Sequence, residues 1–434
     1  MATPARAVAL AVLLDVEGRG PTLAARLARP DVARLPGRER RFVQELTHGV
    51  LRQRGRIDAA LAPLVSRPLG ELDGSLLAVL RLGAYQLLAL RVPDRAAVSE
   101  SVELARGAAP RATGLVNAVL RRLAREGEPE SPDATRDPVG WLSGPGSLPG
   151  WLAARWLDRL GPARAVARAR ALLELPPCHL RVNPRLAPGE REALERRLRL
   201  EPLTVPGALR SGAPREAARL AERGLVFLQD QGSQLVARLA ARDGWMLDAC
   251  AAPGAKATLL ADLARGGGVV ALEPSPRRLG ALVALARRWG SDLRAVRADA
   301  RRPPLSRGFD AVLVDAPCSG IGTLGRHPDV RWRAAPGSLR RHAELQRALL
   351  AALAPLVAPG GRLVYSTCST EPEENEDVVQ AFLSHHAGFR PDAPAPDWAR
   401  EYRSGDFYTT VPERDAGDAF FVAVLRRHRG SVLP

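Results

Sequence analysis

Lysine is almost absent from this chain of 434 residues. Lys256 is the only lysine, although Lys and Arg together number 63. A sequence that otherwise uses arginine for positive charge keeps this one lysine in a loop beside a Pro-Gly pair. Because an ammonium and a guanidinium differ in hydration and geometry, the exception suggests that Lys256 has a role an arginine would not fill.

Long apolar runs are also missing. No stretch reaches the roughly 18 apolar residues that a membrane-spanning helix needs. The apolar run over residues 8–14 is followed at once by acidic residues and lacks the small-residue cleavage pattern of a secretory signal. We therefore expect a cytoplasmic protein with no membrane partner.

Cysteine is scarce, and its spacing excludes two common uses. The four cysteines lie far apart with no C-x-x-C pair, so neither a disulfide framework nor a zinc site has support, and we expect no metal. They are Cys178, Cys250, Cys318 and Cys368.

Composition is that of a soluble globular protein, with 46% hydrophobic and 25% charged residues. The length allows about two to four domains. A formal charge of +16 and a pI of about 11.1 favour a polyanionic partner, nucleic acid first. Because the richness in Ala, Arg, Pro and Leu resembles a genome-wide nucleotide bias, charge alone does not decide the partner.

Two cysteines follow stretches that read as buried strands. Residues 309–314 and 361–365 are short, apolar and bounded by Gly or Pro, as strands covered by helices on both faces are. Cys318 and Cys368 come just after them, among Asp, Ser and Thr. A lone cysteine is often a small buried hydrophobic residue. Since ligands bind at the carboxyl ends of such strands, two thiols at one rim suggest covalent chemistry.

The surroundings of Lys256 are typical of a cofactor loop. A strand is expected over residues 245–250, a turn of small residues over 251–255 and a helix over 256–264. A helix N-terminus after such a turn can meet a polar or anionic ligand group. The G-x-G-x-x-G dinucleotide motif is absent.

Two acids complete the pattern. Glu273 ends the next expected strand, 268–272, about 20 residues after the loop, where an acid can bind ribose hydroxyls. Asp299 follows another expected strand, 293–298. Each acid alone would be an ordinary surface residue, but together with the loop they indicate a nucleoside pocket.

Four motifs follow one another along the chain, over residues 250–256, 315–323, 326–332 and 365–369. Together, and in this order, they resemble the motifs of the RNA cytosine-5 methyltransferases of the NOL/NOP/Sun family. The resemblance implies a Rossmann-like, seven-stranded domain that binds S-adenosylmethionine. It also implies cofactor contacts from the residues Cys250, Ala251, Ala252, Pro253, Gly254, Ala255, Lys256, Glu273, Asp299 and Asp315.

The same resemblance assigns the catalytic residues. Cys368 would attack carbon 6 of cytosine, Asp315 would contact nitrogen 3 or the amino group, and Cys318 would promote loss of the carbon 5 proton. Two positions depart from the family pattern: Ala255 replaces a usual Gly, and Glu273 replaces a commoner Asp. The first puts the loop geometry in question.

The front of the chain differs in character. Apolar residues at three- and four-residue spacing predict helices over 5–16, 38–52, 76–90, 98–105 and 112–125, hence an all-α domain over residues 1–127. Its segments over residues 43–52, 80–88 and 116–122 resemble the NusB-like RNA-binding domain of bacterial 16S ribosomal RNA methyltransferases of the Fmu/Sun branch. Residues 128–150, rich in Pro and Gly, read as a linker. Residues 151–225 resemble a small α+β subdomain, and 226–434 form the catalytic domain.

We therefore expect a monomer that methylates 16S ribosomal RNA or an assembly intermediate of the small subunit. Three alternatives stay open: another ribosomal RNA or a transfer RNA as substrate, a DNA cytosine-5 methyltransferase, and a non-catalytic RNA-binding protein. A DNA enzyme would use the Pro-Cys cysteine as nucleophile and need no Thr-Cys partner, and the intact motif set argues against a non-catalytic protein.

Overall fold

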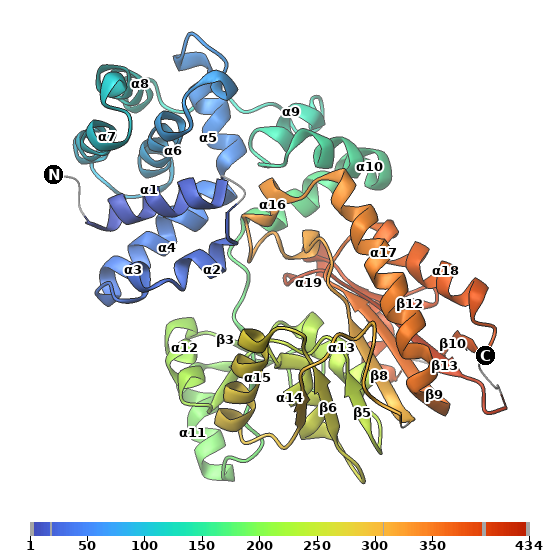
Figure 1. Ribbon diagram of the computed structural model, residues 1–434. Helices are drawn as coiled ribbons and strands as arrows, with labels where there is room; N and C mark the ends of the chain where they lie inside the picture. Colours follow the sequence, from blue (N-terminus) through green and yellow to red (C-terminus); the bar gives the residue numbers. More distant parts are fainter. Residues whose placement is uncertain (1–3, 18–19, 307, 393–395, 431–434) are drawn as a thin grey trace. The chain divides into compact units, whose positions relative to one another are not determined.

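The computed structural model describes residues 4–17, 20–306, 308–392 and 396–430 (Figure 1). The chain forms two compact units. The helical unit comprises Met1–Leu175 and Thr323–Ala335, and the catalytic-motif unit comprises Pro176–Gly322 and Pro336–Pro434.

The helical unit confirms the all-α fold expected for the front of the chain. Each of the five predicted helices is present to within a few residues at its ends. Among the described residues, no helix is long and apolar enough to cross a membrane. The helices are α1 (Pro4–Glu17), α2 (Leu23–Leu27), α3 (Pro30–Ala33), α4 (Gly37–Arg52), α5 (Arg54–Leu61), α6 (Gly74–Ala89), α7 (Asp94–Ala108), α8 (Thr113–Glu126), α9 (Pro138–Ser143), α10 (Gly150–Leu173) and α16 (Val330–Arg333).

Local sequence explains where these helices start and how they pack. Asp73 begins α6 by accepting hydrogen bonds from the backbone N–H groups of Ser75 and Leu76, which a helix start otherwise leaves unpaired. Helix α6 is almost entirely buried and packs against α1, α4, α5, α7 and α8. Helix α10 is broken at Gly161, whose φ of 72° lies in the left-handed region and is followed by Pro162.

The unit extends beyond the predicted helical domain. Residues 128–150, which composition suggested as a linker, contain α9, and residues 150–175 contain α10. The unit also includes Thr323–Ala335, the segment that holds the third sequence motif. Local composition did not show that these segments belong to the helical unit, because their membership depends on contacts between distant parts of the chain.

The catalytic-motif unit confirms the expected Rossmann-like topology. Its main sheet has nine strands in the described residues, where seven were expected, in the order β11-β12-β13-β9-β8-β5-β6-β7, with β10 beside β13. The strands from β7 to β9 are parallel, and β13 is antiparallel to β9. The strands are β5 (Met246–Asp248), β6 (Val269–Leu272), β7 (Arg294–Val296), β8 (Phe309–Asp315), β9 (Val357–Thr367), β10 (Phe389–Pro391), β11 (Arg403–Ser404), β12 (Phe407–Thr410) and β13 (Phe420–Arg427).

Alternating side chains bury both faces of this sheet. On β8, Val312 and Val314 pack with helices α17 (Pro336–Leu353) and α18 (Glu376–His385), whereas Ala311 and Leu313 pack with α13 (Gln231–Ala240) and α14 (Ala255–Leu263). Helix α15 (Pro276–Trp289) packs beside α14. A strand apolar on both sides is typical of a covered parallel sheet, which agrees with the sequence pattern.

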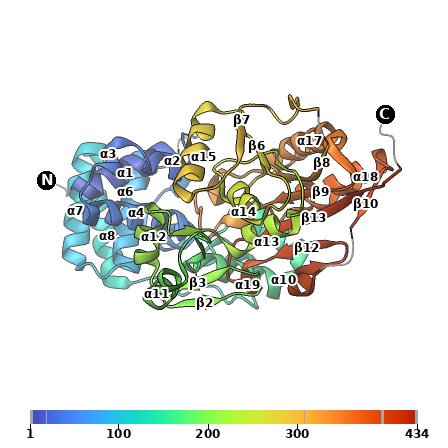
Figure 2. The same ribbon diagram turned by 90° about the horizontal axis from the view of Figure 1, so that it is seen from below.

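A second, antiparallel sheet with the order β2-β3-β1-β4 precedes the main one. Figure 2 shows α11 and α12 near its strands β2 and β3, as expected for a small α+β subdomain. Its elements are β1 (His179–Val182), α11 (Pro188–Leu198), β2 (Leu200–Pro202), β3 (Leu209–Ser211), α12 (Pro214–Glu222) and β4 (Val226–Leu228), and the short helix α19 (Pro412–Asp415) follows β12.

Candidate active site

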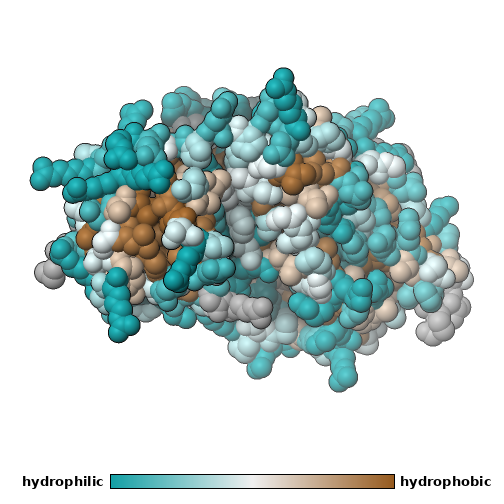
Figure 3. Space-filling model, turned by 90° about the horizontal axis from the view of Figure 1, so that it is seen from above, coloured by the Kyte–Doolittle hydropathy of each residue, from teal (hydrophilic) through white to brown (hydrophobic). Residues whose placement is uncertain are grey.

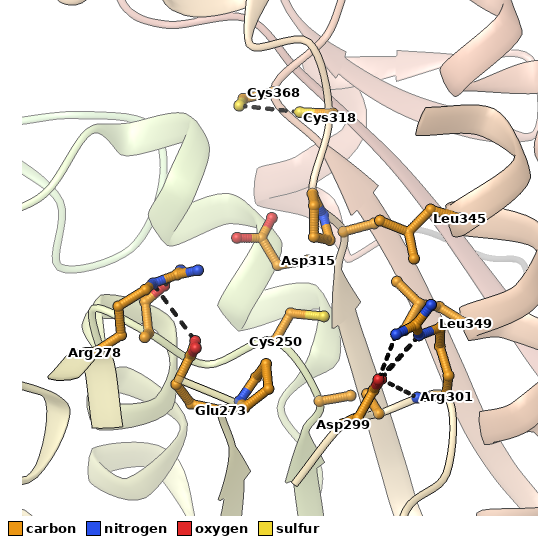
Figure 4. Close-up of a pocket in the computed structure, with 16 residues that line it drawn as sticks. Cys250, Glu273, Arg278, Asp299, Arg301, Asp315, Cys318, Leu345, Leu349 and Cys368 are labelled. Atoms are coloured by element: carbon orange, nitrogen blue, oxygen red, sulfur yellow. Dashed lines mark hydrogen bonds and ion pairs between the residues drawn. The ribbon is translucent and has the colours of Figure 1, made fainter. Parts of the chain in front are cut away.

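A cavity of about 540 Å³ opens where the sheet order reverses, at the carboxyl ends of β5, β6, β7, β8 and β9 (Figure 4). Ligands of doubly wound α/β sheets bind at this place, because the loops diverge there. The cavity has the size of a small-molecule site. Its lining residues are Ala249, Cys250, Ala252, Glu273, Pro274, Arg278, Asp299, Ala300, Arg301, Asp315, Ala316, Pro317, Cys318, Leu345, Leu349 and Cys368.

Seven of the predicted site residues therefore lie around one cavity: Cys250, Ala252, Glu273, Asp299, Asp315, Cys318 and Cys368. The other loop residues, Ala251, Pro253, Gly254, Ala255 and Lys256, are not among those that line it. In the part of the chain that the structure describes, no group of three or more His, Cys, Asp or Glu side chains could hold a metal ion.

The loop before α14 adopts a conformation that needs glycine at one position. Gly254 has a φ of 114°, and a Cβ there would lie only 3.1 Å from Leu285 and 3.3 Å from Leu282. Ala255 is the first residue of α14, where backbone angles are helical and alanine is well tolerated. The replacement of glycine by Ala255 therefore leaves the loop geometry intact.

Two acids form the end of the cavity beside β6 and β7. Glu273 is almost fully buried; its Oε1 accepts a hydrogen bond from the Ser275 backbone N–H at 2.9 Å, and its Oε2 lies 3.6 Å from Nε of Arg278. Asp299 is half-exposed and bonded by Arg301 at 2.6 Å, which holds the pKa of Asp299 below its usual value. Both acids face the cavity.

Lys256 is bonded to a predicted catalytic residue. Its Nζ donates to Oδ2 of Asp315 at 2.7 Å and lies 5.0 Å from the centre of the Phe420 ring. Burial alone would lower the pKa of Lys256, but the charge and hydrogen bond of Asp315 raise it above its ordinary value. Lys256 is therefore an ammonium ion paired with Asp315.

Asp315 receives a second hydrogen bond from the neighbouring strand. Its Oδ1 accepts from the Ser366 hydroxyl at 2.7 Å, because Asp315 and Ser366 stand opposite each other in the β8–β9 register. Each carboxylate oxygen of Asp315 therefore already accepts one hydrogen bond, and each has a further lone pair for a ligand.

The two predicted catalytic cysteines lie together. The Sγ atoms of Cys318 and Cys368 are 3.3 Å apart (Figure 4). The hydrogen bond to Cys368, burial and nearby negative charge raise the pKa of Cys318 well above its usual value. Cys318 is therefore a neutral thiol that can donate its S–H to Cys368. Cys250 is a neutral thiol as well, because burial raises its pKa.

The structure adds residues that the sequence analysis did not single out. Asp248, at the end of β5, is buried with no hydrogen-bond partner for either carboxylate oxygen, and burial beside Asp315 raises its pKa to about 7. It is the first of a series of strand-ending acids, a pattern that could have revealed it. Arg278 and Arg301 were identifiable only by their contacts with Glu273 and Asp299.

Comparisons with known proteins agree with this architecture. The family model described as 16S rRNA methyltransferase RsmB/F matches residues 237–426, and the NusB family model matches residues 3–125. The chain is 39% identical to a putative methyltransferase (MT1451) of Mycobacterium tuberculosis over 98% of this chain and 96% of that protein. It is 38% identical to ribosomal RNA small subunit methyltransferase B of Thermus thermophilus over 97% of each.

Solved structures share the fold. The crystal structure of PH0851 matches with a TM-score of 0.76 at 23% identity, covering 98% of this chain and 100% of that chain. NSun6 from Pyrococcus horikoshii with SFG matches with a TM-score of 0.55 at 21% identity, covering 64% and 98%. The NusB-like fold predicted for the front of the chain and the methyltransferase fold predicted for its rear are both confirmed.

Proposed function

Because this chain belongs to the 16S rRNA methyltransferase RsmB/F family, we propose that it methylates carbon 5 of a cytosine in 16S ribosomal RNA through a covalent adduct. The family and its relatives make it an RNA methyltransferase; carbon 5 and the adduct are part of the proposal. The observation that carries them is the pair of sulfurs, Cys318 and Cys368, at 3.3 Å from each other and in one cavity with Asp315.

Cys368 acts as the nucleophile. Carbon 5 of cytosine is too weak a nucleophile to accept a methyl group until a thiolate adds to carbon 6 and pushes electrons into the ring. The neutral thiol of Cys318 supports this assignment, because an S–H donor at 3.3 Å stabilises a thiolate at Cys368. Lys256 adds positive charge to the same site.

Asp315 orients the base. Because Lys256 and Ser366 fix both of its carboxylate oxygens, Asp315 is held where it can contact the amino group or nitrogen 3 of cytosine. Lys256 thus contributes through Asp315, in addition to the contact with the methionine part of the cofactor that the family resemblance implies.

S-adenosylmethionine, when bound, supplies the electrophilic methyl group. The cavity has the size for such a molecule. Asp248 directly precedes the lining residue Ala249, and its unpartnered buried carboxyl group would favour a cationic ligand. Glu273 would accept hydrogen bonds from the ribose hydroxyls, Asp299 would lie near the adenine, and the loop 250–256 would hold the methionine part.

After methyl transfer, the carbon 5 proton must leave before the thiolate can be expelled. Cys318, 3.3 Å from the sulfur of the adduct, is placed to promote that step, either through water or as a base once its own thiol has lost its proton. When the proton leaves, its bonding electrons restore the ring double bond and the bond from carbon 6 to sulfur breaks. The target base must be unstacked, which an RNA loop permits at little cost.

The helical unit offers a surface for the RNA backbone. A groove between α7 and α8 is lined by four exposed arginines and two acids, with further polar and apolar residues. Figure 3 shows one face of the molecule, on which long hydrophilic side chains surround exposed hydrophobic areas. Arginine binds phosphate oxygens in a forked geometry, so this groove can bind an RNA backbone. The charged residues of the groove are Asp94, Arg95, Glu103, Arg106, Arg121 and Arg125.

The substrate RNA, the target nucleotide and the oligomeric state are part of the proposed function. We propose that the substrate is 16S ribosomal RNA or an assembly intermediate of the small subunit, that the target is the cytosine 967 associated with the Fmu/Sun branch, and that the enzyme acts as a cytoplasmic monomer. Domain roles follow the sequence prediction: RNA binding by residues 1–127 and catalysis by 226–434.

A denaturing gel with S-adenosylmethionine and a 16S fragment tests the chemistry. Cys368→Ala should give neither methylation nor a protein–RNA adduct, because nothing attacks carbon 6. Cys318→Ala should accumulate an adduct linked through Cys368, since proton loss and release slow. Cys178→Ala, a cysteine outside the cavity, is the matched control and should behave as the parent.

The reverse pattern, with an adduct for Cys368→Ala and none for Cys318→Ala, would make Cys318 the nucleophile, as in a DNA-type enzyme. Bisulfite sequencing of RNA from a strain lacking the protein tests the substrate. Loss of one 5-methylcytosine in 16S ribosomal RNA is expected, whereas loss in another ribosomal RNA or a transfer RNA would make that RNA the substrate.

A further inference from the structure

One buried carboxylate joins the two cysteine-bearing loops. Glu374 ends a short 3-10 helix, Pro372–Glu374, and its side chain is fully buried. Its Oε1 accepts the backbone N–H of Ser319 at 2.7 Å, and its Oε2 accepts the hydroxyls of Ser319 and Ser369, each at 2.5 Å. Ser319 directly follows Cys318, and Ser369 directly follows Cys368.

Additional bonds make this junction rigid. The two serine hydroxyls lie 3.2 Å apart, and the backbone N–H of Gly322 donates to the carbonyl of Cys368 at 2.9 Å. The Tyr365 hydroxyl donates to the main-chain carbonyl of Glu374. The carboxylate is therefore held in place from the strand that leads to Cys368.

Burial of a carboxylate costs free energy, because the group loses its hydration and hydrogen bonds must offset that loss. Its one ion-pair candidate within the described residues is His342, whose Nδ1 lies 3.2 Å from Oε1 without the alignment of a hydrogen bond. An amide would be less costly to bury, but it has only one acceptor oxygen, so either the Ser319 N–H or the two hydroxyls would lose their acceptor.

We propose that Glu374 is the positioning residue of the two-cysteine site, whose carboxylate holds the Cys318 and Cys368 loops at the spacing that lets both sulfurs act on one base. Glu374 itself is not among the residues that line the cavity, so it acts through the loops. That both sulfurs act on a base rests on the proposed function; the spacing of the sulfurs does not.

The matched test variants are Glu374→Gln and Glu373→Gln. Both lie in the same short helix and carry the same chemical change, but Glu373 makes none of the bonds to Ser319 or Ser369. Ser319→Ala is a milder variant, because it removes one hydroxyl and keeps the backbone N–H bond to Glu374.

Phenylarsine oxide measures sulfur spacing without RNA or cofactor. Its arsenic forms two As–S bonds with a close dithiol, and its oxygen leaves as water with the two thiol protons. Affinity, read by competition with a small dithiol, should fall about tenfold or more in Glu374→Gln, because misplaced sulfurs lose the advantage of proximity. Glu373→Gln should match the parent, and Cys318→Ala sets the one-thiol baseline.

Methylation kinetics give the second measurement. Glu374→Gln should lower kcat by about 10- to 100-fold, since the transition state needs both sulfurs in place, and leave KM for RNA and the Kd for S-adenosylmethionine unchanged. Ser319→Ala should lower kcat by about fivefold, as expected for one lost hydrogen bond.

Three outcomes separate the explanations. Parent-like arsenical affinity and kcat in Glu374→Gln would overturn the proposal. Loss of cofactor affinity together with kcat, in Ser319→Ala as well, would make Glu374 a general support of the fold and overturn it too. Weakened arsenical binding in Glu374→Gln, with no methylation of cytosine even by the parent, would uphold the positioning role and refute the proposed function.

Discussion

Lys256 and Arg331 are two buried cations with opposite surroundings. Lys256, in the catalytic-motif unit, donates to the carboxylate of Asp315 at 2.7 Å. Arg331, in the helical unit, donates to the backbone carbonyls of Arg52 and Ser147 at 3.0 Å and of Leu172 at 3.2 Å. In the described residues, no carboxylate lies within ion-pair distance of Arg331.

Their pKa values diverge for this reason. Burial opposes both charges, but Asp315 reverses its effect at Lys256, whereas nothing does so at Arg331, whose pKa falls to about 9. Arg331 still carries its charge near neutral pH and fastens the segment Thr323–Ala335 to α4, the turn after α9, and α10. Lys256 belongs to an ion pair of the active site, whereas Arg331 holds parts of the helical unit together.

Replacing Lys256 should have the largest effect, and it should be on activity. Lys256→Met removes the cation that orients Asp315, so kcat/KM should fall about 10²- to 10³-fold, the usual cost of losing a charged group in a preorganised site. The affinity for S-adenosylmethionine should weaken as well. Methyl transfer to a 16S fragment and calorimetry measure these effects.

Stability should change little in the same variant, by about 1 kcal/mol, because Asp315 keeps its bond from Ser366. Lys256→Met with normal activity and normal cofactor affinity would contradict both the pairing and the family-based contact.

The same substitution at Arg331 should act on stability instead. Arg331→Met leaves three buried carbonyls without donors, so the unfolding free energy of the helical unit should fall by about 3 kcal/mol. Cofactor affinity should remain that of the parent. Arg333→Met is the matched control, because Arg333 is exposed and should cost less than about 1 kcal/mol.

Denaturant unfolding, followed with and without S-adenosylmethionine, separates the two substitutions. If Arg331→Met and Arg333→Met destabilise the protein equally, the carbonyl bonds of Arg331 do not give it the special stabilising role that we infer.

A third buried ionisable group, Asp248, should make stability depend on pH, with a smaller effect than the two substitutions above. Its pKa is raised to about 7 in the fold by burial, while the unfolded value is near 3.8, so the folded protein holds a proton there that the unfolded chain has lost. The contribution of Asp248 to stability is therefore full below the unfolded pKa and declines as pH rises towards 7.

The Tm of Asp248→Asn should accordingly rise relative to the parent between about pH 4 and 7 and level off above it. Thermal unfolding across pH, without cofactor, measures the difference. A Tm difference that does not vary with pH would show that Asp248 is ionised in the fold throughout.

Exposed arginines should show the smallest effect. Arg121 and Arg122 are neighbours on α8, both exposed, but only Arg121 lines the groove, and Arg122 is paired with Glu126 at 2.8 Å. Arg121→Gln should weaken RNA binding a few-fold and reduce the slope of log affinity against log salt by about 1. Arg122→Gln should change both the RNA affinity and this slope less.

Filter binding at several salt concentrations would show whether the two arginines differ. Deleting residues 1–127 is a poorer test, because it would remove the carbonyls of Leu51 and Arg52 that Trp332 and Arg331 bind.

Much of the architecture followed from local pattern. Apolar spacing located five of the helices α1–α8 of the front domain, and short apolar runs located the strands β8 and β9, which lead to Asp315, Cys318 and Cys368. These elements were predictable because each depends on residues near in sequence: a period of 3.6 for a helix and two buried faces for a parallel strand.

The sequence alone thus determined the fold class, the family and which residues are candidates for the site. Only the tertiary structure decided how they are paired: Lys256 with Asp315, Cys318 with Cys368, Glu374 with the two serines, and Arg331 with carbonyls of the helical unit. The reason is physical. Periodicity reports which face of an element is buried, whereas a hydrogen bond or a pKa depends on distances of a few ångströms between residues far apart in the chain.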